Sequence, residues 1–353
     1  MKRILLDAYL CRNLGDDLMV LELCQARPGA TFVAPDLSHG IGETLAGVPN
    51  LLESRSGGWF AEAWHSDSYI MCGGSMFIDK SGTSFGERLR FIKRWGRRLA
   101  VALIIRGRRG AVEVIGCNVG PIQSRWGVVF FGAFLRMATR VTVRDSPSEE
   151  LVLRWTGQPP LKAPDMVLSY IARLPERLPC TERMRPIVGI SVMQWPDLDA
   201  SASVEQYLIL LRCLRAQCPD AQVKLFGFQS LVVRDDNIAS RISGQTDWSN
   251  VFDCSYRGDI DACIQEYSSC SHIVATRFHS GILALGLGIP MVQLVYSKKT
   301  SDFLREAGWE GSQWATGKDL MAEHSDDIVT SLWSALPVKF APAEAGLHSD
   351  SVG

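Results

Sequence analysis

Short apolar runs alternate with segments of helical spacing along nearly the whole chain, and this alternation constrains the fold more than any other feature. Arg3–Ala8 and Ser68–Cys72 have the length of buried strands, and a helical pattern at Asp16–Arg27 lies between them. Strands that alternate with helices in this way build parallel sheets through crossover connections. The sequence therefore predicts an α/β fold.

The same rhythm fills both halves of the chain. In the first half we expect strands at Arg3–Ala8, Thr31–Ala34, Ser68–Cys72, Ala111–Cys117, Arg140–Arg144 and Met166–Ser169. In the second half we expect strands at Ile187–Val192, Gln222–Phe226, Val251–Cys254, His272–Ala275 and Met291–Val295, with helices at Val204–Gln217, Asp259–Ser269, Gly281–Gly286, Thr300–Ala307 and Lys318–Leu336. The motif SPSE at Ser146–Glu149 offers an N-cap serine, a proline at the first helical position and a capping-box glutamate.

A charged segment with three prolines, Arg173–Pro186, separates the two halves. It lacks apolar periodicity and is typical of a linker between domains. We therefore expect an N-terminal Rossmann-like domain at residues 1–172, a linker at 173–186, a C-terminal Rossmann-like domain at 187–336 and a disordered tail at 337–353. The two domains would face a cleft, with ligands bound beyond the carboxyl ends of the strands.

Composition excludes several classes of function. The chain of 353 residues has 37 Lys and Arg against 38 Asp and Glu, so its net charge of -1 gives no sign of a nucleic-acid partner and any cationic function must be local. Its ten cysteines contain no CxxC pair, which predicts reduced thiols, a cytoplasmic setting and neither a disulfide scaffold nor a structural zinc site. We expect no signal peptide and no transmembrane segment, because the longest apolar run, Trp126–Leu135, is about half the length that spans a bilayer.

The strongest candidate site is TRFHSG, which begins at Thr276. Arg277 and His279 follow an expected strand, and a helix of small residues begins directly after Ser280. A guanidinium, an imidazole and a helix N-terminus at one strand end favour a phosphate or carboxylate ligand. The plain alternative is a surface arginine beside a histidine that is satisfied within a domain edge.

Further candidates lie at other junctions between a strand and a helix. Arg144 follows an expected strand and has the forked geometry that clamps anions, or it is part of a surface cluster with Asp145. Asp16, in the segment NLGDD, would repel a phosphate, so this is not a dinucleotide fingerprint. Asp16 would instead accept a proton from a hydroxyl group or cap its helix.

Glycine and lysine supply the remaining candidates. Gly73 and Gly74 permit close approach of the backbone to a ligand, although loops use glycine widely. Lys299 follows the strand that ends at Val295 and would neutralise an anion held by Arg277 and His279, or it belongs to a solvated lysine pair.

A basic stretch at Arg88–Arg109 holds nine Lys or Arg residues and no acid, shortly before the apolar run Trp126–Leu135. Together they would dock the protein on an anionic membrane surface. The alternative is a solvated basic helix followed by a buried core helix.

Taken in order, these junctions resemble the polysaccharide pyruvyltransferase family. The matching elements are NLGDD, GGSMF, GCNVGP, VRDSPSEELV, PDMVL and a block from Phe252 to Leu304. Ser75 and Phe278 depart from the commoner family residues, glycine and leucine. The resemblance implies a GT-B-like fold and transfer of pyruvate from phosphoenolpyruvate onto two hydroxyls of one sugar as a cyclic ketal, with release of phosphate.

Carried onto the matching positions, the resemblance implies that Arg277 and His279 lie on the phosphoenolpyruvate side, in the C-terminal domain. Arg144 and Lys299 become further anion-binding candidates, and Asp16 lies near the acceptor, in the N-terminal domain. The acceptor would belong to an exopolysaccharide or cell-wall glycan of the bacterial envelope, or to its lipid-linked precursor. We expect His279 to transfer the proton and Asp16 to orient or deprotonate a sugar hydroxyl.

We expect no metal and no cofactor besides the donor substrate. Peripheral contact with the inner face of the membrane is a further expectation. Two other classes stay open: a GT-B glycosyltransferase that uses a sugar nucleotide, and a catalytically silent glycan-binding member of the fold.

Overall fold

The computed structural model describes residues 2–35, 44–45, 47–54, 58–79, 84–174 and 185–336. Within these residues the chain divides into two compact units. The first unit comprises residues 2–10 and 16–169, and the second comprises residues 11–15 and 170–336. The expected tail lies outside the described residues, as does most of the expected linker.

The first unit is built on a parallel seven-stranded sheet with the order β3-β2-β1-β4-β6-β8-β9. Its strands are β1 (Lys2–Ala8), β2 (Ala30–Ala34), β3 (Leu51–Glu53), β4 (Ser68–Cys72), β6 (Ala111–Cys117), β8 (Arg140–Val143) and β9 (Leu161–Lys162). A separate parallel pair joins β5 (Phe77–Asp79) to β7 (Val119–Ile122). The α/β fold expected from the apolar alternation is therefore confirmed.

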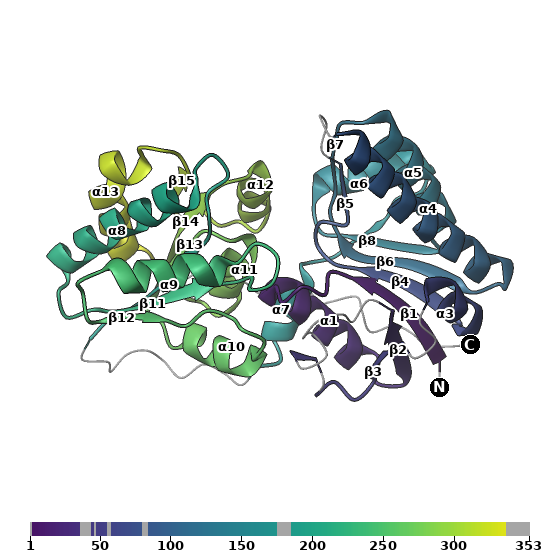
Figure 1. Ribbon diagram of the computed structural model, residues 1–353, viewed down its shortest axis with the longest axis horizontal. Coiled ribbons are helices and arrows are strands. Elements are labelled where there is room, and N and C mark those ends of the chain that lie inside the picture. The colour runs from purple at the N-terminus through teal and green to yellow at the C-terminus, as the bar shows by residue number, and fades with distance from the viewer. Residues whose placement is uncertain are drawn as a thin grey trace. The chain divides into compact units, whose positions relative to one another are not determined.

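Helices cover both faces of this sheet. They are α1 (Leu14–Ala26), α3 (Trp59–His65), α4 (Phe85–Gly107), α5 (Arg125–Met137), α6 (Ser146–Thr156) and α7 (Met166–Ile171). Figure 1 shows α3 to α6 along one face and α1 on the other. Large buried side chains such as Tyr69, Trp95 and Phe131 fill the layer between the sheet and α3 to α6. The burial of this apolar surface holds the first unit together.

The structure corrects two local predictions. Met166–Ser169, expected as a strand, forms the first part of helix α7, where the Asp165 carboxylate accepts a hydrogen bond from the backbone N–H of Val167 at 3.0 Å. The N-cap of α6 is Asp145 and not Ser146, since Asp145 accepts from Ser148 N at 2.7 Å. In both places, an aspartate one position before the expected start accepts a hydrogen bond from a backbone N–H group that has no partner within the helix.

The second unit repeats the architecture with a parallel six-stranded sheet in the order β12-β11-β10-β13-β14-β15. Its strands are β10 (Ile187–Val192), β11 (Gln222–Gly227), β12 (Val251–Asp253), β13 (His272–Ala275), β14 (Met291–Val295) and β15 (Gln313–Ala315). Its helices are α8 (Ala200–Gln217), α9 (Asp235–Gln245), α10 (Ile260–Ser268), α11 (Phe278–Gly286), α12 (Lys298–Glu306) and α13 (Leu320–Ser334). An apolar core lies between the sheet and helices α8, α9 and α13.

Candidate functional site

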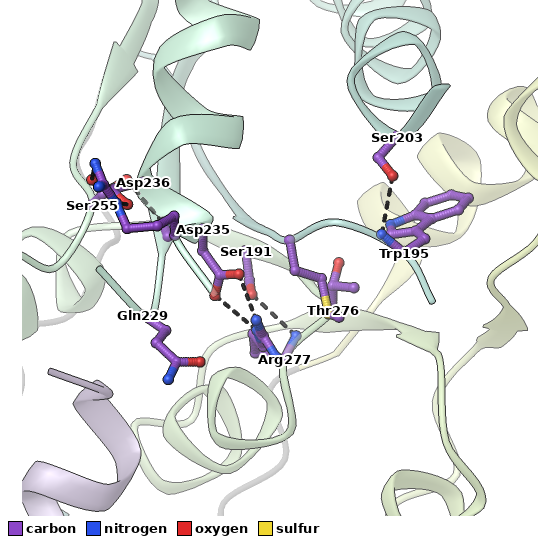
Figure 2. A network of polar contacts seen from close by, with 12 residues as sticks. Ser191, Trp195, Ser203, Gln229, Asp235, Asp236, Ser255, Thr276 and Arg277 are labelled. Atoms are coloured by element: carbon purple, nitrogen blue, oxygen red, sulfur yellow. Dashed lines mark hydrogen bonds and ion pairs between the residues drawn. The ribbon is translucent and has the colours of Figure 1, made fainter. Parts of the chain in front are cut away.

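The junction between β13 and α11 contains Arg277, which is the N-cap residue of α11. Arg277 Nε donates to Asp235 Oδ2 at 2.8 Å, and Nη2 donates to the second carboxylate oxygen. Its backbone N–H donates to Ser191 Oγ at 3.1 Å. Figure 2 shows Asp235 and Ser191 both directed at Arg277. The bidentate pair fixes the guanidinium at the N-terminal end of the helix.

Asp235 is fully buried, whereas the Arg277 side chain keeps 16% of its surface exposed. Burial alone would lower the pKa of Arg277, but the charge of Asp235 and the neighbouring Tyr296 outweigh it and raise that pKa. Arg277 therefore stays a cation with one edge held inside the unit and part of its surface open to a ligand.

The position of Asp235 depends on a glycine at the end of β11. A Cβ on Gly227 would lie 2.6 Å from the backbone nitrogen of Asp236, so only glycine allows the start of α9 to approach the strand so closely. The sequence interpretation missed Asp235. The available signal was its place at the start of a helix that follows a strand, which is the rule that identified Arg277.

The helix expected to begin directly after Ser280 begins earlier, at Phe278, because Arg277 is its N-cap residue. His279 therefore lies in the first turn of α11, where it contacts Gly15. A Cβ built on Gly15 would lie only 1.9 Å from His279 Nδ1, so the imidazole rests directly against the glycine backbone. The segment around Gly15 is held in the second unit by antiparallel pairing: Leu14 N donates to the Phe228 carbonyl at 2.9 Å, and Asn13 bridges Gln229. The glycine of NLGDD thus sets the position of the histidine ring.

Lys299 and His279 both contact Phe278. The Lys299 ammonium lies 4.4 Å from the centre of the Phe278 ring, and the His279 ring meets the same ring edge-on at 5.2 Å. An aromatic face attracts a cation by about 0.5–2 kcal/mol, depending on desolvation. Phe278 therefore holds Lys299 close to α11.

Ser280 is completely buried and supports the helix from within the unit. The Tyr267 hydroxyl donates to the Ser280 carbonyl at 2.7 Å and lies 2.8 Å from its Oγ. The structure places Arg277, His279 and Lys299 at the start of α11. Ser280 lies in the same turn but is buried.

Arg144 is in the first unit, at the end of β8, with 1% of its side chain exposed. It forms an ion pair with Asp165, and its Nε donates to Asn118 Oδ1 at 2.8 Å. A Cβ on Gly74 would lie 2.6 Å from Arg144 Nη2, while the Gly74 carbonyl accepts from Asn118 N at 2.7 Å. Asp165 thus balances the charge of Arg144 inside the unit. The Arg144 side chain also contacts Asn118 and Gly74, and so joins the loops that follow β4, β6 and β8.

Asp16 is partly exposed in the first turn of α1. Burial raises the pKa of Tyr9, and the Asp16 charge contributes in the same direction. The Tyr9 hydroxyl donates to the Ser75 carbonyl at 3.4 Å, and its ring lies against Gly73, whose φ of +133° requires glycine. Tyr9, which the sequence interpretation did not single out, therefore lies with Asp16 and Gly73 at the carboxyl end of the first sheet.

In the part of the chain that the structure describes, no group of three or more His, Cys, Asp or Glu residues is arranged to hold a metal ion. No helix in the same part is long and apolar enough to cross a membrane. The described cysteines form no disulfide with one another.

Comparison with known proteins identifies both family and fold. The family model described as polysaccharide pyruvyl transferase matches residues 8–298. No curated protein matches the chain significantly. Among solved structures, UDP-GlcNAc 2-epimerase from Methanocaldococcus jannaschii is similar with a TM-score of 0.61 and 9% identity, covering 97% of this chain and 95% of that one.

Two sugar-handling proteins have the same fold. Anabaena HepE, solved with UDP and glucose, has a TM-score of 0.52 and 15% identity over 94% of this chain and 93% of its own. Spinosyn rhamnosyltransferase SpnG, solved with thymidine diphosphate, has a TM-score of 0.54 and 12% identity over 95% of this chain and 92% of its own. These similarities establish a GT-B-like fold, as the family resemblance implied.

Proposed function

Because the chain belongs to the polysaccharide pyruvyl transferase family, we propose that it transfers pyruvate from phosphoenolpyruvate to two hydroxyls of one sugar, which become a cyclic ketal. The family match over residues 8–298 is the observation that carries this proposal. The acceptor would be a sugar of an exopolysaccharide or cell-wall glycan, or of its lipid-linked precursor.

The reaction balances without a redox partner. A proton adds to the methylene carbon of phosphoenolpyruvate, and a sugar hydroxyl oxygen bonds to the cationic centre that results. The bond from this carbon to the phosphate oxygen breaks, and the second hydroxyl oxygen closes the ring. One of the two hydroxyl protons returns to the general acid that protonated the methylene carbon. The other leaves with phosphate. The protein has to move these protons and hold two anionic groups.

His279 is the candidate for proton transfer. An imidazole ordinarily titrates near pH 6.5, so it exchanges protons readily at neutral pH. The contact between its ring and Gly15 supports this role because a general acid must be held in one orientation. Asp16 is the candidate that orients or deprotonates a sugar hydroxyl.

Arg277 and Lys299 would hold the carboxylate and phosphate of the donor. Two cations and a helix N-terminus suit a ligand with several negative charges, and they would also stabilise the departing phosphate. Asp235 keeps Arg277 in place, and Phe278 does the same for Lys299. Ser280 would act by supporting α11.

Arg144, Gly73 and Gly74 would shape the acceptor side in the first unit. The internal pairing of Arg144 with Asp165 and Asn118 favours a role in holding these loops. An anion contact made by Arg144 itself stays a prediction.

The test combines product analysis with a matched histidine pair. Purified protein with phosphoenolpyruvate and a sugar acceptor should release phosphate and form a ketal that mass spectrometry detects. His279→Ala should lower turnover by about 100-fold or more while phosphoenolpyruvate still binds in calorimetry. His65→Ala, which changes an exposed histidine in α3, should leave turnover unchanged.

Equal turnover in a folded His279→Ala protein would reject the role of that residue. Binding of a nucleotide sugar without binding of phosphoenolpyruvate would favour the glycosyltransferase alternative. If the protein binds a glycan but turns over neither donor, the silent glycan-binding alternative holds.

A further inference from the structure

Helices α4 and α5 expose large apolar side chains to solvent. On the first two turns of α4, Phe85 is 82% exposed and Leu89 is 43% exposed. On the first two turns of α5, Trp126 is 53% exposed and Val129 is 60% exposed. We call these four residues the α4–α5 patch. Exposed aromatic and aliphatic side chains of this size, grouped on neighbouring helices, indicate an interaction surface.

Ring contacts join α4 to the α5 part of the patch. Phe91 of α4 meets Phe130 of α5 edge-on at 6.0 Å, and Phe130 in turn contacts the exposed Trp126 at 6.4 Å. Residues three or four positions apart lie on one helix face, so Phe85 pairs with Leu89 and Trp126 with Val129. Figure 1 shows α4 and α5 side by side in the first unit.

The side chains of the basic stretch Arg88–Arg109 have different roles. Some of its arginines serve the fold: Arg98 is buried against Asp7, Arg97 stacks on Trp59, and Arg108 donates to the carbonyls of Ala63 and Ser66. The exposed group lies on the first turns of α4 and consists of Arg88, Arg90, Lys93 and Arg94. Of these, Arg88 lies three positions after Phe85 and Lys93 lies four positions after Leu89, so these two share the helix face of the patch. Across the described ranges, none of these four forms an ion pair with an acid.

The acids near the exposed basic group are few. Glu87 lies on the same turns of α4, but its carboxylate accepts from Ser84 N at 2.8 Å in a capping box and is thereby held at the helix start. The patch therefore presents apolar side chains, including a tryptophan, within a positively charged surrounding. A bilayer surface with anionic headgroups matches this combination, since apolar rings enter the interface while Lys and Arg bind the headgroups.

We propose that the α4–α5 patch and the basic side chains beside it dock the protein on an anionic phospholipid surface. Charge complementarity favours an anionic lipid surface, because Arg88 and Lys93 lie on the same helix face as the apolar residues Phe85 and Leu89. The proposal concerns the first unit alone and does not depend on the reaction proposed above. Docking would bring the protein to the surface where lipid-linked sugars are displayed.

Vesicle sedimentation tests the charge component. The full-length protein should sediment with phosphatidylglycerol-containing vesicles and stay in solution with phosphatidylcholine alone. Each Lys or Arg near such a surface contributes about a factor of five, so Arg88→Gln with Lys93→Gln should weaken binding by about 30-fold. The matched control, Arg106→Gln with Arg154→Gln, removes two exposed arginines elsewhere on helices of this unit and should bind as the wild type does.

A second variant pair tests the apolar component. Phe85→Ser with Trp126→Ser should weaken binding by about tenfold or more and leave the circular dichroism spectrum unchanged, because both side chains are exposed. Leu161→Ser, at an exposed site on β9, is the control. Equal sedimentation with both kinds of vesicle would overturn the proposal. The proposal would also be overturned if the protein bound no vesicles but self-associated in ultracentrifugation, and if the Phe85 and Trp126 changes abolished that self-association.

Discussion

Arg144 and Arg277 have the same kind of partner but differ in their exposure to solvent. Each stands after a strand, where the sequence predicts an anion clamp, and each is held by a buried aspartate, Asp165 or Asp235. The difference lies in exposure: the Arg144 side chain is closed to solvent, whereas that of Arg277 is partly open. Of these two arginines, Arg277 is the one that combines a fixed guanidinium with an exposed surface.

Gly15→Ala tests whether the position of the His279 ring matters. The new methyl group would lie 1.9 Å from His279 Nδ1, so the ring has to move. A displacement of about 1 Å at a catalytic group can cost about 100-fold in rate, and we expect a fall in kcat of that order. Gly29→Ala is the control, since its methyl group would meet nothing within 4 Å. Unchanged kcat in a folded Gly15→Ala protein would contradict the prediction.

Between elements, a buried ion pair fastens strand β1 to helix α4. The Asp7 carboxylate accepts from Arg98 Nε at 2.8 Å and Nη2 at 3.0 Å, and from the Tyr69 hydroxyl at 2.7 Å. Burial would raise the pKa of Asp7, but Arg98 and Tyr69 outweigh it and lower that pKa. Arg98 thus serves the packing of α4, although it lies in the middle of the basic stretch.

The Asp7 pair should make stability depend on pH in the acid range. Because the folded pKa of Asp7 is lowered, its contribution is complete above the unfolded value of about 3.9 and is lost as pH falls through the folded pKa. Near neutrality, Asp7→Asn should cost about 3–5 kcal/mol, since it leaves Arg98 buried without its partner. Urea unfolding should show this difference shrinking steadily below about pH 4.

Glu205→Gln is the control for that experiment. It breaks an exposed pair with Arg212 and should change the free energy of unfolding by less than about 1 kcal/mol. A difference between the wild type and Asp7→Asn that stays constant down to low pH would show that the carboxylate charge is not what fastens β1 to α4.

At the scale of the whole molecule, each unit has its own apolar core. Trp95 and Phe131 lie in the core of the first unit, and Tyr207 and Leu225 lie in that of the second. Each unit contains buried cysteines. The first unit has Cys24, Cys72 and Cys117, and the second has Cys263 and Cys270. These thiols can report on the unfolding of the two units separately.

Alkylation during urea unfolding should therefore resolve two transitions. Burial raises the pKa of Cys24 and of Cys117 to about 12, so neither thiol reacts at neutral pH until its unit opens. We expect the first-unit thiols to become reactive together, and the second-unit thiols to do so at a different urea concentration. Cys218, which is partly exposed, should react without urea. Mass spectrometry of the labelled peptides gives each midpoint, and a common midpoint for both groups would contradict independent cores.

The sequence by itself determined the α/β class, the positions of most strands along the chain and the junctions where Arg144, Arg277 and His279 lie. Ser68–Cys72 and Met291–Val295 are strands as predicted, because apolar periodicity and length are local properties of the chain. A short run such as Met166–Ser169 misled that reasoning, since a few apolar residues fit a strand or a helix equally well.

Only the tertiary structure decided which side chains meet. It paired Arg277 with Asp235, placed Gly15 against His279 and separated the buried Arg98 from the exposed Arg88. These contacts join residues that are distant in the chain, and the register of sheets and helices in space fixes them. Local patterns carry no information about that register, so the sequence could indicate where the chemistry lies but not how its groups are held.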